Sequence, residues 1–138
     1  MLRYIKQVKK SKARIDWVSA PDIKDRVLHL QKKLHLDWLK PNNIYTVRST
    51  GANTRAVARI WGLSRIWQIT LKSEPKYIIE VISEKFDRLG QTDRDKVLIH
   101  EIVHIPKNFS GSLIPHIRRG KNKFSDKLKY LVAQYYNK

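Results

Sequence analysis

Apolar residues recur at helical spacing in the first third of the chain. The positions that share the i, i+4, i+7 and i+11 spacing are Ile23, Val27, Leu30 and Leu34. They form one stripe on a helix surface, which predicts an amphipathic helix from Pro21 to about Leu36. Pro21 suits the first helical turn, and Pro41-Asn42-Asn43 predicts a break after the helix.

The middle of the chain predicts strands. Residues Ile44–Thr50 are rich in β-branched side chains, and Arg55–Trp61 alternates arginine with small or apolar residues, as in a strand exposed on one face. Tyr77–Ile82 is the strongest strand signal. Between these segments, Leu63–Leu71 fits either a strand or a helical turn.

A strongly apolar helix is expected next. Thr92 and Asp95 have the spacing of a capping box, and Pro106 disfavours helical backbone at Ile105, where we expect the helix to end. Because this segment is apolar on most sides, it is typical of a buried helix. A polar loop and a last helix, from about Ser125 to Tyr136, complete an α+β domain.

Length and composition fit one domain with a hydrophobic core. The chain has 138 residues, 41% of them hydrophobic, so we expect a basic arm over residues 1–20 and a single domain over residues 21–138. The absence of cysteine excludes disulfides, thiolate catalysis and cysteine-ligated metals, which leaves His, Asp and Glu as metal ligands. Neither a secretory signal nor a membrane-spanning stretch is recognised, so we expect a cytoplasmic protein without a membrane partner.

The charge is strongly positive and unevenly distributed. The formal net charge is +17, of which residues 1–40 and 105–138 carry +7 each and the middle carries +3. Cationic ends favour nucleic acid or a nucleoprotein as a partner. The candidate contacts are Lys9, Lys10, Lys12, Arg14, Arg119, Lys121 and Lys123. The tryptophans are Trp17, Trp38, Trp61 and Trp67. They suit base stacking or packing in the core and at its rim, of which we favour packing.

The buried helix carries the sequence His100-Glu101-Ile102-Val103-His104. Residues i and i+4 share a helix face with Cβ atoms roughly 5–6 Å apart, so two imidazoles could bind one zinc ion while Glu101 accepts a proton from water. The alternative is that both histidines are core residues bonded to backbone carbonyls and that Glu101 pairs with an arginine. We favour the metal site, because an unpaired carboxylate is poorly tolerated in apolar surroundings.

A catalytic zinc site needs a third protein ligand. Lys107 and Ser110 stand where the metzincin spacing requires Gly and His, and no Glu follows Glu101, which excludes the gluzincin arrangement. The downstream candidates are His116 and Asp126. We favour His116, because imidazole is the commoner zinc ligand.

The motif and its surroundings resemble a known family, the HExxH metallopeptidases of archaea and their viruses or phages. The matching segments are His100-Glu-Ile-Val-His104-Ile-Pro, Phe109-Ser-Gly, Pro115-His116 and the upstream Tyr77-Ile-Ile-Glu-Val-Ile-Ser-Glu-Lys-Phe-Asp-Arg-Leu. The resemblance covers roughly residues 48–116. It implies a minimal zincin-like fold, a small sheet packed on the HExxH helix with flanking helices, distantly similar to SprT- and Spartan-type proteases. It also implies His100, His104 and His116 as ligands and Glu101 as the base.

The leading hypothesis is therefore a zinc-dependent endopeptidase, with Zn²⁺ as cofactor and a peptide or protein as substrate. An exposed sheet edge could receive the substrate strand, and Arg118 or Tyr130 is a candidate for contacting the transition state or an anion. Two alternatives stay open. One is a non-catalytic nucleic-acid- or ribosome-binding protein, which the charge favours, and the other is a purely structural zinc site.

Overall fold

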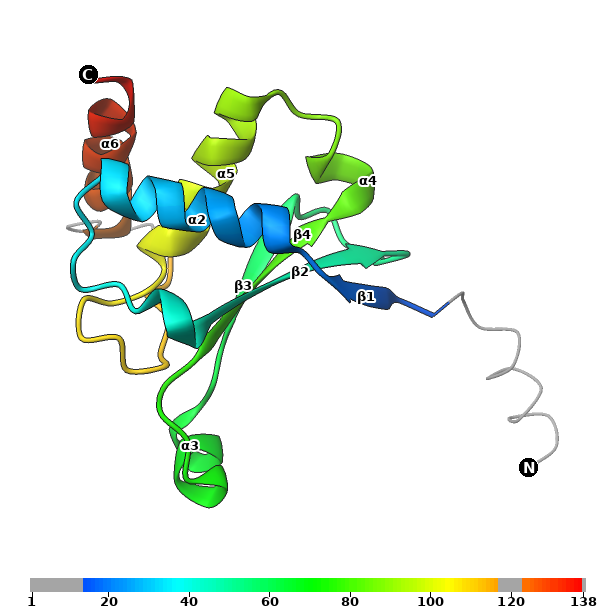
Figure 1. Cartoon of the computed structure of the whole chain (residues 1–138), viewed down its shortest axis with the longest axis vertical. Helices are drawn as coiled ribbons and strands as arrows, with labels where there is room; N and C mark the ends of the chain where they lie inside the picture. Colours follow the sequence, from blue (N-terminus) through cyan, green and yellow to red (C-terminus); the bar gives the residue numbers. More distant parts are fainter. Residues whose placement is uncertain (1–13, 117–122, 138) are drawn as a thin grey trace, which may run out of the picture.

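The computed structural model describes residues 14–116 and 123–137. Within these residues the chain forms a mixed four-stranded sheet and five α-helices (Figure 1). The strands are β1 (Asp16–Ser19), β2 (Ile44–Thr50), β3 (Ala58–Gly62) and β4 (Tyr77–Ile82). The helices are α2 (Pro21–Lys33), α3 (Arg65–Leu71), α4 (Ser83–Phe86), α5 (Gln91–Val103) and α6 (Lys123–Tyr136). The expected α+β class is confirmed, and none of the described helices is long and apolar enough to cross a membrane.

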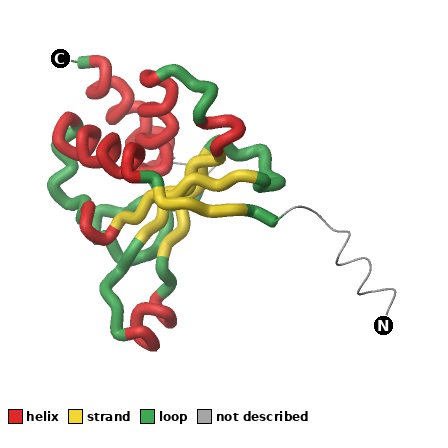
Figure 2. Tube along the Cα trace, turned by 45° about the vertical axis from the view of Figure 1, so that its right-hand side comes forward, coloured by secondary structure: helices red, strands yellow, loops and turns green. Residues whose placement is uncertain are grey.

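The strands lie in the order β1-β2-β4-β3, so that β1 and β3 form the two edges. Strand β2 pairs with β4 in parallel, and each edge strand pairs with its neighbour in antiparallel fashion. Helices α2, α5 and α6 gather on one side of the sheet (Figure 2). On that side α2 contacts β2 and α5 contacts β3, which brings the HExxH helix against an edge strand.

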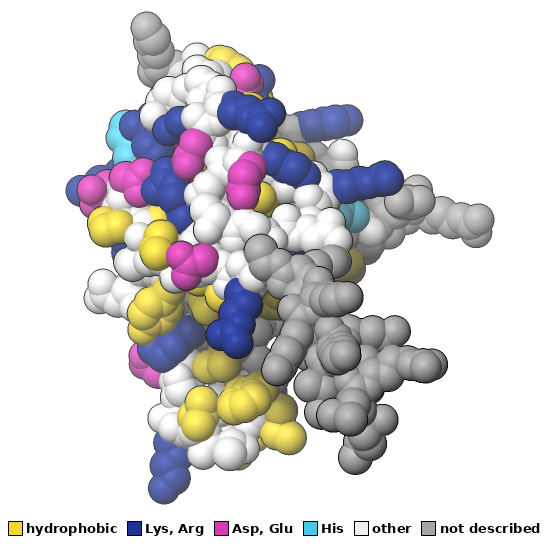
Figure 3. All heavy atoms as spheres, turned by 90° about the vertical axis from the view of Figure 1, so that its right-hand side faces the viewer, with side chains coloured by type: hydrophobic (Ala, Val, Ile, Leu, Met, Phe, Trp, Pro, Cys, Tyr) yellow, Lys and Arg dark blue, Asp and Glu magenta, His cyan; other side chains and the backbone are white. Residues whose placement is uncertain are grey.

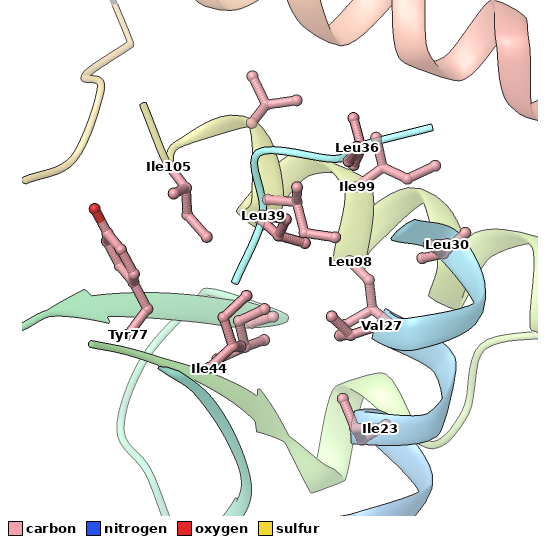
Figure 4. Close-up of a cluster of buried hydrophobic side chains, with 14 of the residues drawn as sticks. Ile23, Val27, Leu30, Leu36, Leu39, Ile44, Tyr77, Leu98, Ile99 and Ile105 are labelled. Atoms are coloured by element: carbon pink, nitrogen blue, oxygen red, sulfur yellow. The ribbon is translucent and has the colours of Figure 1, made fainter. Parts of the chain in front are cut away.

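The hydrophobic core lies between the sheet and helices α2 and α5. Figure 4 shows side chains that meet there: Ile23, Val27 and Leu30 from α2, Leu98 and Ile99 from α5, and Ile44 and Tyr77 from the strands. All are at most 4% exposed. Burial of apolar surface, at about 25 cal/mol per Å², holds the two helices on the sheet.

Helix α2 is confirmed, and its expected stripe is buried along its whole length. The helix ends at Lys33, three residues earlier than the apolar spacing predicts. His35 adopts the left-handed conformation with φ 54°, and the N–H of Leu36 returns to the carbonyl of Gln31 at 3.0 Å. This closing turn satisfies a free helix carbonyl, so Leu34 and Leu36 reach the core from beyond the helix.

The two strongest strand signals are confirmed to the residue, since β2 and β4 have the expected bounds. Strand β3 covers Ala58–Gly62 in place of the expected Arg55–Trp61. The ambiguous segment Leu63–Leu71 contains helix α3, which ends where Lys72 adopts the left-handed conformation with φ 53°.

Strand β1 lies inside the segment expected as a basic arm. Its residues Asp16–Ser19 pair with β2, and the following Ala20 is buried. All four side chains of β1 are exposed, so no hydrophobic alternation signals the strand in the sequence. The sheet therefore begins before residue 21, while Lys9, Lys10 and Lys12 lie outside the described residues.

The expected capping box at Thr92 and Asp95 is wrong. Helix α5 begins at Gln91 after Gly90, without a side-chain cap. Asp95 instead lies buried and accepts two hydrogen bonds from the guanidinium of Arg26, both at 2.7 Å, and one from the hydroxyl of Tyr135 at 2.6 Å. The carboxylate thus ties α5 to α2 and α6, a tertiary role that takes precedence over local capping.

Candidate metal centre

His100 and His104 lie at the C-terminal end of α5. His100 is in the last turn, and His104 is the capping residue with helical backbone angles, φ −66° and ψ −17°. Because the backbone stays helical through His104, the i, i+4 spacing brings the rings together with their centroids 5.3 Å apart. The expected shared face is confirmed.

His116 joins the pair from the loop that follows α5. Its Nε2 lies 3.0 Å from Nε2 of His100, and its ring centroid lies 4.5 Å from that of His104. The ligand atoms offered by the three rings all lie within 4.8 Å of one another. Three zinc–nitrogen bonds of about 2.0–2.1 Å to one ion require donor atoms grouped in this way.

A hydrogen bond fixes the orientation of His104. Its Nδ1 lies 2.6 Å from the carbonyl oxygen of Ile114. A carbonyl can only accept, so Nδ1 carries the proton and Nε2 keeps its lone pair for a ligand. Metal-binding histidines in proteins are commonly oriented by such a bond.

Side chains from α3 and β4 hold the loop that carries His116. The hydroxyl of Tyr77 accepts from the N–H of Gly111 and donates to the carbonyl of Ser112, both at 2.8 Å. The amide of Gln68 donates to the carbonyl of Ser110 at 2.9 Å. Tyr77 and Gln68 are buried, so these bonds are costly to lose and restrict the path of the loop.

Two glycines let this loop approach the end of β3. Gly111 has φ +95°, and a Cβ there would collide with the amide of Gln68 and the carbonyl oxygen of Leu63. A Cβ on Gly62 would collide with the carbonyl oxygen of Gly111. The contact between loop and strand therefore requires glycine on both sides.

Glu101 lies beside the histidines with only 7% of its surface exposed. Burial raises the pKa of its carboxyl to about 7. No salt bridge to Glu101 occurs within residues 14–116 and 123–137, which argues against the alternative that an arginine pairs with it. The carboxylate is thus free to exchange a proton with a group in the cavity.

The electrostatic setting keeps His100 and His104 neutral. Burial, together with the neighbouring His104 and His116, lowers the pKa of His100 to about 4. Burial also lowers the pKa of His104, although its bond to Ile114 opposes the shift. Because a metal binds the neutral imidazole, His100 and His104 are in their ligating form at neutral pH.

The histidines and Glu101 open into a cavity of about 750 Å³. One wall is formed by the edge strand and the residues that lead into it, positions 56–60. The other walls are mainly apolar, with Val97 from α5, Leu113 from the loop, and Leu128 and Val132 from α6. A cavity of this size and lining suits a ligand with an apolar group.

Phe124, at the start of α6, packs against all three imidazoles. Its ring centroid lies 5.0 Å from that of His100 and 4.4 Å from those of His104 and His116. Phe124 is 3% exposed and belongs to the core. The last helix therefore supports the cluster from behind with an apolar side chain.

The other residues expected at the site lie elsewhere or are not described. Asp126 is exposed and is not part of the histidine cluster in the described chain, so the structure brings His116 and not Asp126 to the pair. Tyr130 is 62% exposed and does not line the cavity, so it makes no contact there. Arg14 is exposed, and Lys123 begins α6. Outside the described residues lie Arg118, Arg119 and Lys121.

Several residues that shape the site carry no signal in the sequence. Tyr77 and Gln68 act through bonds to a distant loop, and the apolar wall combines α5, α6 and the edge strand. Such contacts depend on tertiary packing and cannot be inferred from local spacing. The close pair Gly62 and Gly111 offers the one available hint, since an isolated glycine at a strand end is typical of close backbone approach.

The fold and the site define an α+β protein with an HExxH helix and a candidate metal centre of three histidines. The family model described as "Putative phage metallopeptidase" matches residues 15–132. The chain belongs to this family, and the resemblance drawn from the motifs is confirmed. No curated protein and no solved structure matches the chain.

Proposed function

We propose that the protein is a zinc-dependent endopeptidase with a zincin-like arrangement of its sheet and HExxH helix. The observation that carries this proposal is the convergence of three imidazoles and one buried carboxylate in a single cavity. Family membership supports peptides or proteins as substrates. Without the histidine cluster, the cavity would fit many apolar ligands.

The donor set fits zinc. Three imidazoles with grouped ligand atoms are a common ligand set of catalytic zinc sites, which keep one further position for water or substrate. His100, His104 and His116 would hold the ion. A zinc ion bound there supplies Lewis acidity, which lowers the pKa of a water molecule and polarises a peptide carbonyl.

Glu101 is the group that moves the proton in this proposal. It follows His100 directly, lines the same cavity and lacks a cationic partner within the described chain. Its carboxylate accepts a proton from the attacking water and returns it to the leaving amine. A carboxylate held in a salt bridge would be a weaker base for the water and, once protonated, a less available acid for the leaving amine.

The edge strand β3 offers a place for the substrate backbone. Among the described residues it pairs with β4 on one side only, and positions 56–60 line the cavity. An extended peptide can add to such an edge through main-chain hydrogen bonds, which would lay its scissile bond across the histidines and Glu101. The side chains of the bound peptide would then contact the apolar residues that line the cavity.

The test combines metal analysis with proteolysis of an unfolded protein by the wild type and by Glu101→Gln. We expect the wild type to bind zinc and to cleave, and the variant to bind zinc and to lose roughly 10²- to 10⁴-fold in rate. Asp126→Asn, an exposed change on α6, is the matched control and keeps both properties. A folded wild type that binds no zinc would overturn the proposal, as would undiminished cleavage by Glu101→Gln.

A further inference from the structure

Trp17 and Trp61 donate their indole N–H groups to the same carboxylate. The distances to Glu80 are 3.2 Å from Trp17 and 2.9 Å from Trp61. Glu80 is fully buried on β4, whereas the two tryptophans, on the edge strands β1 and β3, are 54% and 50% exposed. The carboxylate therefore anchors two aromatic rings whose remaining surface faces solvent.

Arg59 neutralises Glu80. Its Nε and one terminal nitrogen donate to the two carboxylate oxygens at 2.9 and 3.1 Å. Although burial opposes ionisation, the hydrogen bonds from Arg59 and the two indoles lower the pKa of Glu80 to about 2. The carboxylate of Glu80 is therefore ionised at any physiological pH, and it is held in place by its pairing with Arg59 and by the two indole hydrogen bonds.

These residues belong to the sheet face that points away from α2 and α5. The register places Trp61 beside Ile78 and Ile78 beside Tyr45, in one row across three strands. Ile78 and Tyr45 are exposed, whereas Ile79, the next residue of β4, is buried against the helices. We call this surface, made of Trp17, Tyr45, Trp61 and Ile78, the open sheet face. The tryptophans are expected to pack in the core or at its rim, and Trp17 and Trp61 instead lie half-exposed on this face. Trp38 does pack against the core.

Two hollows lie side by side on the open sheet face. One, of about 290 Å³, is lined by Trp17, Val47, Trp61, Ile78 and Glu80. The other, of about 210 Å³, is lined by Tyr45, Trp61, Gly62, Leu63, Lys76 and Ile78. The two hollows share Trp61 and Ile78, so the ring of Trp61 lies between them. The ring of Trp17 lines the first hollow, and the ring of Tyr45 lines the second. This spacing suits flat groups carried in succession on one flexible chain.

The charge around the open sheet face selects an anionic occupant. The Nζ of Lys76 lies 5.6 Å from the ring centroid of Tyr45. The guanidinium of Arg59 lies 5.5 Å from the ring centroid of Trp61, but its charge is balanced by Glu80, so the positive charge beside this face comes from Lys76 and from the net +17 of the chain. The one carboxylate in the hollows, Glu80, is already paired. Figure 3, seen from the side on which β1 lies, shows hydrophobic side chains in its lower half, the lowest of them at the height of α3 in Figure 1, with basic and acidic side chains beside them. A second copy of the chain would bring its own charge of +17 against this one, which opposes self-association.

We propose that the open sheet face binds single-stranded nucleic acid. Successive bases stack on Trp17, Trp61 and Tyr45, and Lys76 contacts the phosphate backbone. Aromatic rings on an uncovered four-stranded sheet are one established way to bind unpaired bases, and stacking tolerates any base. The site is separate from the histidine cluster, so it does not depend on the proposed peptidase activity.

The test measures binding of a fluorescent single-stranded oligothymidylate by anisotropy, with the full-length chain at two salt concentrations. We expect Tyr45→Ala and Trp61→Ala each to weaken binding roughly 5- to 150-fold, the range observed for loss of one stacked base. The hydrogen bonds to Glu80 come from Trp17, Arg59 and Trp61 and not from Tyr45, so the Tyr45 variant keeps these bonds. Trp67→Ala is the matched control, because Trp67 is equally exposed but lies on α3 outside both hollows. It keeps wild-type affinity.

Three outcomes would overturn the proposal. Wild-type affinity in both Tyr45→Ala and Trp61→Ala would assign binding to cations elsewhere on the chain. Equal affinity for a duplex of the same length, lost only with salt, would indicate contacts to phosphate alone. A concentration-dependent dimer that Tyr45→Ala abolishes, measured by sedimentation, would assign the open sheet face to a second copy.

Discussion

His104 and Ile114 bind each other through two hydrogen bonds. The ring Nδ1 of His104 donates to the carbonyl of Ile114 at 2.6 Å, and the N–H of Ile114 donates to the carbonyl of His104 at 2.7 Å. The end of the HExxH helix and the loop that brings His116 are thereby joined at a histidine of the candidate metal centre. One candidate ligand, His104, is oriented by the same contact that positions the loop carrying the next, His116.

The first prediction concerns the third ligand. His116→Ala should reduce metal affinity by more than the roughly 10- to 100-fold typical of losing an outer partner of a ligand. The reason is that His116 supplies one of the three clustered ligand atoms found in the described part of the chain. Titration with Co²⁺, followed by its visible absorption, measures the affinity and the coordination geometry together.

Asp126→Ala is the control for His116→Ala. Asp126 is exposed and lies outside the cluster, so its variant should keep the wild-type Co²⁺ spectrum and affinity. The opposite pattern, with affinity lost in Asp126→Ala and kept in His116→Ala, would assign the third ligand to the carboxylate.

The second prediction concerns Gly111. Gly111→Ala should destabilise the protein by about 1–3 kcal/mol, because φ +95° is strained for alanine and the added methyl group meets Gln68 and Leu63. The free energy of unfolding from urea titration measures this loss. Gly90→Ala is the control: it has open space around it, and it should change stability by less than about 1 kcal/mol. Equal effects at the two positions would contradict the argument.

The third prediction concerns acid stability and Asp95. Although burial opposes ionisation, hydrogen bonds from Arg26, Tyr135 and Gln91 lower the pKa of Asp95 below its ordinary 3.8. A group with a lowered folded pKa stabilises the protein above its unfolded pKa, and this contribution is lost as the pH falls through the folded pKa. Stability should therefore decline below about pH 4 in the wild type, and less steeply in Asp95→Asn.

Urea unfolding at several pH values measures the contribution of Asp95. At neutral pH, Asp95→Asn should cost about 1–3 kcal/mol, because Arg26 and Tyr135 lose a charged acceptor. Asp93→Asn, an exposed neighbour on α5, should leave the curve close to that of the wild type. An identical acid response in Asp95→Asn and the wild type would contradict the assignment.

The fourth prediction concerns substrate preference and rests on the proposed peptidase activity. Because Val97, Leu113 and Leu128 form an apolar wall of the cavity, peptides with a large apolar residue beside the scissile bond should be cleaved fastest. Leu128→Ala should change the ratio of kcat/KM between leucine- and alanine-containing peptides roughly tenfold. Leu71→Ala, exposed on α3, is the control and leaves the ratio unchanged. A preference for charged residues in the wild type would contradict this view of the wall.

Local patterns predict the elements whose stability is encoded locally. The stripe of α2 and the β-branched runs of β2 and β4 face one core, so helical spacing predicts the first and residue composition predicts the other two. β1 has no such pattern, because its partners are the backbone of β2 and the carboxylate of Glu80. A short strand held by pairing and one indole contact carries no periodic signal.

The candidate site divides in the same way. His100, Glu101 and His104 are set by spacing along one helix, which a sequence displays directly. His116 was favoured by ligand chemistry and by elimination, and its approach to the helix depends on Tyr77 and other distant partners. Asp95 shows the limit of local reasoning, since its capping spacing is genuine while its hydrogen bonds go to Arg26 and Tyr135.

The contact between Gly62 and Gly111 has a consequence for engineering. The end of the strand proposed to receive substrate and the loop that ends in His116 touch without any side chain between them. The end of β3 and the loop therefore depend on each other for their positions, and both depend on the hydroxyl of Tyr77, which accepts a hydrogen bond from the loop. Grafting the third histidine onto another HExxH helix would require the loop, the strand end and the tyrosine together.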